Sequence, residues 1–299
     1  MKKPIVTALA AVALSAGAHA ETKFYGKFNV STAYNDSTEE FNMDSHASRL
    51  GIKGSDDLGF ATLVYKAEYQ HNVDEGGLKA RGTYVGLKYE GLGTVKLGKM
   101  DTPLKKSQGK FDLFNDIYDI KRNLLGENRD NNSINYTSEK LGNLTVSASA
   151  ILEEGSDGYS VSGVFEKGNI YASVAYDKDV PDSEDVAKLD SVLRATAIVT
   201  QGDIRLGAIV NYAEEGNFDD TGFAFNAALT KGLHTFKAQF GTAEQAIDDQ
   251  GGINEVQTLS IGVDRKLAKT TTAYFYADSE EQNDADAVNE LRIGLVHKF

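Results

Sequence analysis

The chain has 299 residues, a formal net charge of −13 and no cysteine. This acidic balance excludes nucleic acid as a partner, because phosphates are bound by a surplus of lysine and arginine. The lack of cysteine excludes disulfides and thiolate metal sites. After the first twenty residues, no stretch has the roughly 18 apolar residues of a transmembrane helix.

The N-terminus is typical of a secretory signal peptide. Met1, Lys2 and Lys3 give a short positive region, and a run of small and apolar residues follows from Ile5 to Ala18. The sequence Ala18-His19-Ala20 then fits a cleavage site between small residues. We therefore expect residues 1–20 to be removed and residues 21–299 to form one domain, since barrels of this length fold as single domains.

Strands with one apolar and one polar face are expected from the start of the mature chain. Between Thr22 and Tyr34, apolar and small residues alternate with polar ones, so that Phe24 and Phe28 fall on one face and Lys27 and Asn29 on the other. About 16 such segments follow one another, most of them close to the 9–11 residues that a tilted strand needs to cross a bilayer. They are 22–34, 46–55, 60–70, 81–89, 94–100, 129–138, 143–151, 159–166, 169–177, 188–199, 204–213, 221–230, 233–242, 253–265, 270–278 and 288–299.

The connections between these segments alternate between short and long. The short ones are turn-like and often contain glycine, at 56–59, 90–93, 139–142, 167–168, 200–203, 231–232 and 267–269. The long ones are polar and mostly acidic, at 35–45, 71–80, 101–128, 152–158, 178–187, 214–220, 243–252 and 279–287. An even number of strands with tight turns at one end predicts an all-β, antiparallel transmembrane barrel of about 16 strands in an outer membrane. The barrel must close because an open sheet edge cannot be hydrogen-bonded in hydrocarbon.

The last segment alternates Leu291, Ile293 and Leu295 with polar residues and ends on Phe299. A C-terminal aromatic residue on such a strand resembles the signal that the outer-membrane assembly machinery recognises. Phe299 is equally compatible with the aromatic girdle at the membrane surface. Both interpretations place the chain in an outer membrane.

Several segments in the first half of the mature chain, taken in order, resemble the trimeric general-diffusion porins of Gram-negative bacteria. They are Phe24-Tyr25-Gly26-Lys27, Ala47-Ser48-Arg49-Leu50-Gly51-Ile52-Lys53-Gly54, Asp57-Leu58-Gly59, Ala80-Arg81-Gly82-Thr83-Tyr84-Val85-Gly86-Leu87-Lys88, Gly93-Thr94-Val95-Lys96-Leu97-Gly98-Lys99, Asp101-Thr102-Pro103-Leu104 and Asn132-Ser133-Ile134-Asn135-Tyr136. The second half is similar only in its strand rhythm and in Phe299.

The resemblance implies a homotrimer in contact with outer-membrane lipids and lipopolysaccharide. It also implies a third external loop that folds into the barrel and narrows a water-filled pore for ions and small polar solutes. In this chain that loop is 101–128, with acidic candidates Asp112, Asp116 and Asp119 and, less securely, Glu127. The family's opposing basic ladder corresponds to Lys27, Arg49, Arg81 and Arg129. The Pro-Glu-Phe-Gly-Gly loop tip of the enterobacterial members is absent, and residues 111–116 stand near its place.

Strand alternation supports the ladder in part. Lys27 shares a polar face with Asn29, Arg49 lies opposite Leu50, and Arg129 is in phase with Asn131, Ser133 and Asn135. Arg81 is in phase with Val85 and Leu87, which blurs its face. The acidic surplus on the external loops would gather cations at the pore mouth, so we expect a mild cation preference.

Other functions remain open as alternatives. A channel selective for sugars or anions, or a plugged or adhesive barrel, would share this strand pattern; Tyr25 and Tyr118 are candidates for an aromatic sugar track. A barrel lipase or protease would need a nucleophile beside a base, and no G-x-S-x-G motif occurs. Gly93–Lys99 nearly matches a P-loop, but Met100 stands where Ser or Thr would hold magnesium. The scattered histidines show no metal-ligand spacing, so no metal or cofactor is expected.

Overall fold

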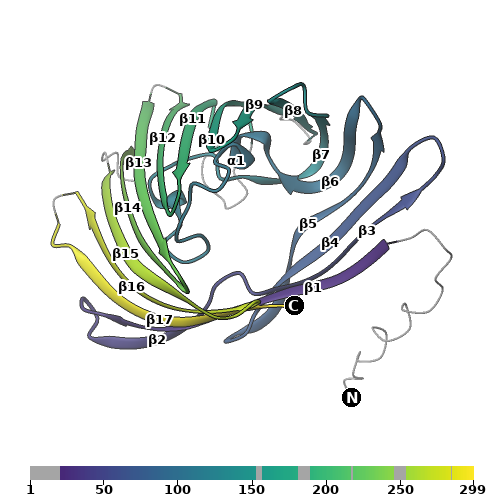
Figure 1. The fold of residues 1–299 in the computed structure, drawn as a ribbon. Coiled ribbons are helices and arrows are strands. Elements are labelled where there is room, and N and C mark those ends of the chain that lie inside the picture. Colours follow the sequence, from purple (N-terminus) through teal and green to yellow (C-terminus); the bar gives the residue numbers. More distant parts are fainter. Residues whose placement is uncertain (1–20, 153–156, 181–188, 217, 246–253, 284) are drawn as a thin grey trace, which may run out of the picture.

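The computed structural model describes residues 21–152, 157–180, 189–216, 218–245, 254–283 and 285–299. The predicted signal peptide, residues 1–20, lies outside this described part. The described chain curls into a closed antiparallel β-barrel with one long loop inside it (Figure 1). No helix of the described residues is long and apolar enough to span a membrane.

The barrel is built from consecutive strands joined to their neighbours in sequence. The strands are β1 (Glu21–Asn35), β2 (Glu40–Ser45), β3 (Arg49–Asp57), β4 (Thr62–Asn72), β5 (Gly76–Tyr89), β6 (Gly93–Asp101), β7 (Arg129–Ser138), β8 (Leu144–Ile151), β9 (Gly158–Lys167), β10 (Ile170–Lys178), β11 (Ser191–Gln201), β12 (Ile204–Glu215), β13 (Phe218–Lys231), β14 (His234–Gln245), β15 (Asn254–Ala268), β16 (Thr271–Gln282) and β17 (Val288–Lys298). The loop after β6 holds the helix α1 (Pro103–Ser107) and the 3-10 helix η1 (Ile120–Arg122).

The first and last strands close the barrel. β1 pairs with β17 from Lys27↔Lys298 to Asn35↔Glu290. The other edge of β1 pairs with β3 along its first half and with β2 along its second half, so β2 and β3 form one broken strand. The described sheet of 17 strands therefore makes a barrel of sixteen, as the sequence predicted.

Phe299 completes this seam. Its backbone N–H donates to the Gly26 carbonyl (3.2 Å), and its own carbonyl accepts from the Gly26 N–H (3.0 Å). Its ring packs against Phe24 and Phe28, with centroids 5.9 and 5.7 Å away. A Cβ on Gly26 would lie 2.3 Å from a Phe299 ring carbon, so glycine is required for this contact.

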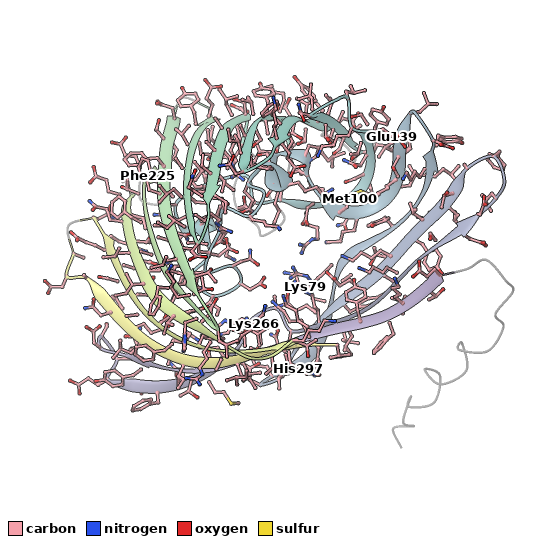
Figure 2. The ribbon with its side chains drawn as sticks, in the orientation of Figure 1. Lys79, Met100, Glu139, Phe225, Lys266 and His297 are labelled. Atoms are coloured by element: carbon pink, nitrogen blue, oxygen red, sulfur yellow. The ribbon has the colours of Figure 1, made fainter. Side chains whose placement is uncertain are left out.

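Side chains stand on both surfaces of the wall (Figure 2). The two surfaces differ in polarity. On β12, for example, Leu206 and Val210 are 55% and 46% exposed, whereas Asn211, the residue after Val210, is buried. Buried positions of other strands include Asn29, Ser31 and Asn135. An apolar exterior around a polar interior is the arrangement that a lipid environment requires.

The seven predicted tight turns are confirmed, and each of the sixteen predicted strands overlaps a strand of the structure. Several predicted long connections were wrong in extent. Residues 40–45 form β2 rather than loop, and the connection placed at 71–80 is mostly strand, with only residues 73–75 between β4 and β5. The connection placed at 214–220 is also mostly strand, because β12 runs to Glu215 and β13 begins at Phe218. Above the apolar belt both strand faces meet water, so the pairing continues after the alternation in the sequence has ended.

Residues 102–128, here called the inner loop, fold against the interior of the barrel. Thr102 caps α1 by accepting a hydrogen bond from the Lys105 N–H (3.0 Å), and Pro103 occupies the first turn. Apolar loop side chains then enter three buried clusters on the wall. In the first, Leu104 packs with Val192 and Ala213. In the second, Phe111, Ile120 and Leu124 pack with Ile198 and Ile209. In the third, Phe114 and Tyr118 pack with Tyr274 and Tyr276.

Glycines in the wall provide room for this loop. A Cβ on Gly207 would lie 2.9 Å from the Phe111 ring. Cβ atoms on Gly222 and Gly241 would lie 2.2 and 2.4 Å from oxygens of Asn123. The second half of the barrel is therefore shaped to receive the loop.

Buried ion pairs hold the loop in place. Arg194 of β11 is fully buried and donates to the Glu127 carboxylate, to the Leu125 carbonyl (2.7 Å) and to Asn211 (3.0 Å). Nearer the other wall, Arg122 of η1 pairs with Asp278 (2.6 Å) and with Glu280 (2.9 Å). Because these charges are desolvated, loss of one partner leaves the other unpaired in a buried position.

We predict that Arg194→Ala destabilises the barrel by about 3–5 kcal/mol, because it leaves the Glu127 carboxylate without its buried partner. The free energy of unfolding in guanidinium, measured on protein refolded in detergent, checks this. Lys231→Ala is the control, since its pair with Asp203 is well exposed and is worth no more than about 1 kcal/mol. Equal losses in the two variants would contradict the anchoring role of Arg194.

Candidate functional site

The tip of the inner loop meets the barrel wall at Asp116. This residue has a left-handed φ of +69°, an uncommon conformation for a residue other than glycine. Its carboxylate pairs with the Lys27 ammonium of β1 and lies 3.8 Å from the Arg49 guanidinium of β3. The Lys27 and Asp116 side chains are only 10% and 12% exposed, so this charge contact is largely desolvated.

Arg81 reaches the lumen because of a β-bulge. Ala67 pairs with Thr83 but Tyr69 pairs with Ala80, so β5 carries one extra residue beside Arg81. The bulge shifts the alternation, and this explains why Arg81 seemed in phase with the outward Val85. Inside the barrel, Arg81 donates to Gln70 (2.7 Å) and to Glu68 (3.3 Å) of β4.

Arg129 lies at the start of β7 and pairs with Asp101 at the end of β6 (2.7 Å). A second bulge follows it, because Gly98 pairs with Ser133 whereas Met100 pairs with Asp130. The alternation from Ser133 therefore does not extend to Arg129, and that part of the sequence argument was wrong. Arg129 is nevertheless within electrostatic reach of Arg81, so all four ladder residues belong to one region.

The other two loop acids have local partners. Asp112 accepts hydrogen bonds from the backbone N–H groups of Phe114 (3.0 Å) and Ile120 (3.4 Å). Burial and then the neighbouring Asp119 carboxylate raise the pKa of Asp112 well above its ordinary value, which weakens its negative charge. Asp119 caps η1 by accepting from the Lys121 N–H (3.0 Å). Within the described residues, Asp116 is the predicted loop acid whose carboxylate contacts the ladder.

Sequence reasoning missed Glu68 of β4. This buried carboxylate accepts from Tyr25 (2.7 Å) and pairs with Lys66 (3.1 Å) as well as with Arg81. Its alternation with Lys66 and Gln70 along the predicted strand 60–70 was the available signal.

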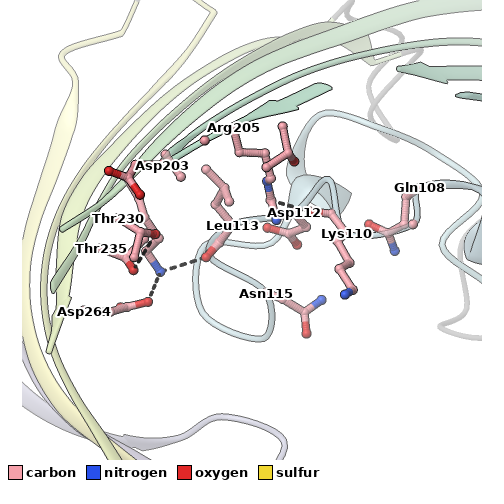
Figure 3. Close-up of a pocket in the computed structure, with 15 residues that line it drawn as sticks. Gln108, Lys110, Asp112, Leu113, Asn115, Asp203, Arg205, Thr230, Thr235 and Asp264 are labelled. Atoms are coloured by element: carbon pink, nitrogen blue, oxygen red, sulfur yellow. Dashed lines mark hydrogen bonds and ion pairs between the residues drawn. The ribbon is translucent and has the colours of Figure 1, made fainter. Parts of the chain in front are cut away.

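A pocket of about 740 Å³ lies between the inner loop and the wall (Figure 3). Lys110, Asp112 and Asn115 of the loop face Arg205 of β12 and Lys237 of β14 across it. Lys237 donates to the Leu113 carbonyl (2.8 Å) and lies 3.2 Å from Asp264. Most of the lining residues are polar, and they carry charges of both signs, so the lumen beside the loop suits water and polar solutes.

The described residues contain no group of three or more histidine, aspartate or glutamate side chains placed to hold a metal ion.

Comparison with known proteins gives one family and many similar folds. The family described as Gram-negative porin matches residues 6–285. Among solved structures, the anion-selective porin from Comamonas acidovorans superposes with a TM-score of 0.82 at 18% identity, covering 94% of this chain and 100% of its own. The trimer form of OmpT from Vibrio cholerae superposes with a TM-score of 0.78 at 17% identity, covering 94% of this chain and 100% of its own. OmpF from Salmonella typhi, in complex with daunomycin, superposes with a TM-score of 0.73 at 12% identity, covering 93% of this chain and 97% of its own. No curated protein matches in sequence.

At these identities the solved structures establish the fold, and the family match covers most of the chain. The protein is therefore a member of the Gram-negative porin family, an outer-membrane channel rather than an enzyme.

Proposed function

We propose that the protein forms a water-filled channel for passive diffusion of ions and small hydrophilic solutes, narrowed where the inner loop faces the basic ladder. The observation that carries this proposal is the contact of Asp116, on a loop inside the barrel, with Lys27 and Arg49 on the wall. Opposed charges across a narrow wet passage orient water and dipolar solutes, and they bias which ions enter. Lipid-like molecules would have to displace that ordered water.

Further parts of the proposal concern export and assembly. The resemblance to trimeric porins supports a homotrimer embedded among outer-membrane lipids and lipopolysaccharide, and OmpT, one of the similar structures, is described in a trimer form. The exposed apolar exterior supports lipid contact. Export by a signal peptide at residues 1–20, and recognition of Phe299 by the outer-membrane assembly machinery, rest on the sequence.

A channel dedicated to sugars has less support. Sugar recognition would use aromatic faces free in the lumen, but Tyr118 is buried against Phe114 and Tyr276, and its hydroxyl donates to Glu290. The Tyr25 hydroxyl is likewise engaged by Glu68, and Lys53 lies over its ring. Neither ring is presented as a free platform.

The ion preference of the channel depends on which charges act most strongly on the passing ion. The net charge of −13 supports the mild cation preference expected from the sequence, if charges at the mouths decide it. Charges at the narrowest point act on the ion at closer range, so they can outweigh the charges at the mouths.

We predict that refolded protein inserted into a planar bilayer conducts in uniform steps that close in threes, because each barrel of a trimer holds its own pore. Single-channel recording in KCl measures this. Protein that is folded and heat-modifiable on a gel but gives no conductance would contradict the channel.

We predict that Asp116→Asn shifts the reversal potential under a KCl gradient toward anions, because Lys27 and Arg49 lose their facing carboxylate. Asp112→Asn and Asp119→Asn are matched controls that should shift the reversal potential less, because Asp116 is the predicted loop acid that contacts the ladder. Both controls should keep the loop fold, since an amide oxygen can still accept the backbone hydrogen bonds. Equal shifts in all three variants would show that Asp116 has no special place at the constriction.

A further inference from the structure

A second group of basic side chains lies beside the ladder. It comprises Lys66 of β4, Lys96 of β6 and Lys106 of α1, and we call it the cationic strip. Lys66 stands opposite Tyr84 of β5 in the strand register, and Lys96 stands opposite Gly86, two residues further along the same strand, so the two lysines lie close together on the wall. Lys106 of the loop is within electrostatic reach of both. Because α1 belongs to the inner loop and the two strands belong to the wall, the strip spans the space between loop and wall.

Neighbouring residues on β5 accommodate the two wall lysines. A Cβ on Gly82 would lie 3.2 Å from the Lys66 nitrogen, so glycine leaves room for that ammonium group. The Lys96 nitrogen lies 4.8 Å from the centre of the Tyr84 ring, a distance that suits a cation–π contact.

Carboxylates neutralise only part of this region. Among the described residues, none lies within 4.0 Å of the Lys96 or Lys106 nitrogen, and Lys66 shares Glu68 with Arg81. The ladder and the strip together supply seven cations: Lys27, Arg49, Lys66, Arg81, Lys96, Lys106 and Arg129. In the described part of the chain, the carboxylates within 4.0 Å of any of these cations are Asp101, Asp116 and Glu68, so the seven cations outnumber them by four.

Repulsion among ammonium groups that outnumber their carboxylate partners is relieved when an anion lies between them. Lys66, Lys96 and Lys106 each have three N–H donors, so a carboxylate or phosphate group could accept hydrogen bonds from the loop side and the wall side together. A permeating cation would meet a potential of the same sign at this point. The local charge thus opposes the cation preference expected from the acidic chain as a whole.

We propose that the cationic strip is a transient binding position for the carboxylate or phosphate group of small permeating solutes, and that it makes this channel prefer anions. The inference rests on the proposed function as a porin and specifies its solute class. Because the Debye length falls from about 8 Å at 0.15 M salt to about 3 Å at 1 M, the preference should be strongest in dilute salt.

The test is the reversal potential of the trimer under a KCl gradient at low and at high salt. We expect an anion-side potential that weakens at high salt, and a clear shift toward cations in the triple variant Lys66→Gln/Lys96→Gln/Lys106→Gln. Lys140→Gln is the control, because Lys140 lies in a tight turn and pairs with exposed Glu166. Lys106→Gln alone should give a smaller shift in the same direction, and it serves if the triple variant fails to fold.

Inorganic phosphate provides a second readout. Added to the bath, it should interrupt the open-channel current briefly in the wild type and in Lys140→Gln, and less often in the triple variant. A conducting channel with a cation-side potential, or a triple variant that keeps the anion preference and the interruptions, would overturn the inference while leaving the porin function intact. A folded protein without conductance would overturn both.

Discussion

Closure of the sheet between β1 and β17 is the constraint on which the rest of the molecule depends. In hydrocarbon, every backbone N–H and C=O must be bonded within the protein, so a sheet that crosses a bilayer cannot keep an open edge. Closure fixes which face of each strand looks inward, and it places polar residues such as Asn29 and Asn135 around a lumen. Gly26 and Phe299 complete the seam, so the last residue of the chain also takes part in closing the wall.

The lumen is divided unequally by the inner loop. Strands β10 to β13 and β16 offer the loop apolar side chains, glycine gaps and the buried Arg194, and they are covered by it. Strands β1 and β3 to β7 keep a polar and basic lining, touched by the loop at Asp116. On the proposed function, the loop would direct solutes toward the wall with the surplus of positive charge, and this local surplus is opposite in sign to the net charge of the chain.

Much of this could be predicted from the sequence, because strand alternation and turn spacing are local signals. Sixteen strands, seven tight turns and an inward-folding third loop followed from them and from the resemblance. Strand β2 and the faces of Arg81 and Arg129 could not be predicted in this way. Bulges, and strand pairing beyond the lipid belt, depend on the neighbouring strand of the sheet rather than on local sequence. The partners of Asp119, and the backbone partners of Asp112, lie within the loop itself, and these contacts depend on how the loop folds. Alternation places Glu68 on the polar face of its strand, but its contacts with Tyr25, Lys66 and Arg81 come from three different strands and are not a local signal.

We expect ions to cross the barrel through the space between the inner loop and the wall of β4 to β6. Because the chain has no cysteine, a single introduced thiol can be modified without background. Single-channel current through Lys96→Cys, recorded while a bulky methanethiosulfonate reagent is added, should fall in discrete steps. Ile293→Cys on the exterior, where the native side chain is 64% exposed, should show no change. An unchanged current through modified Lys96→Cys would contradict a passage beside this wall.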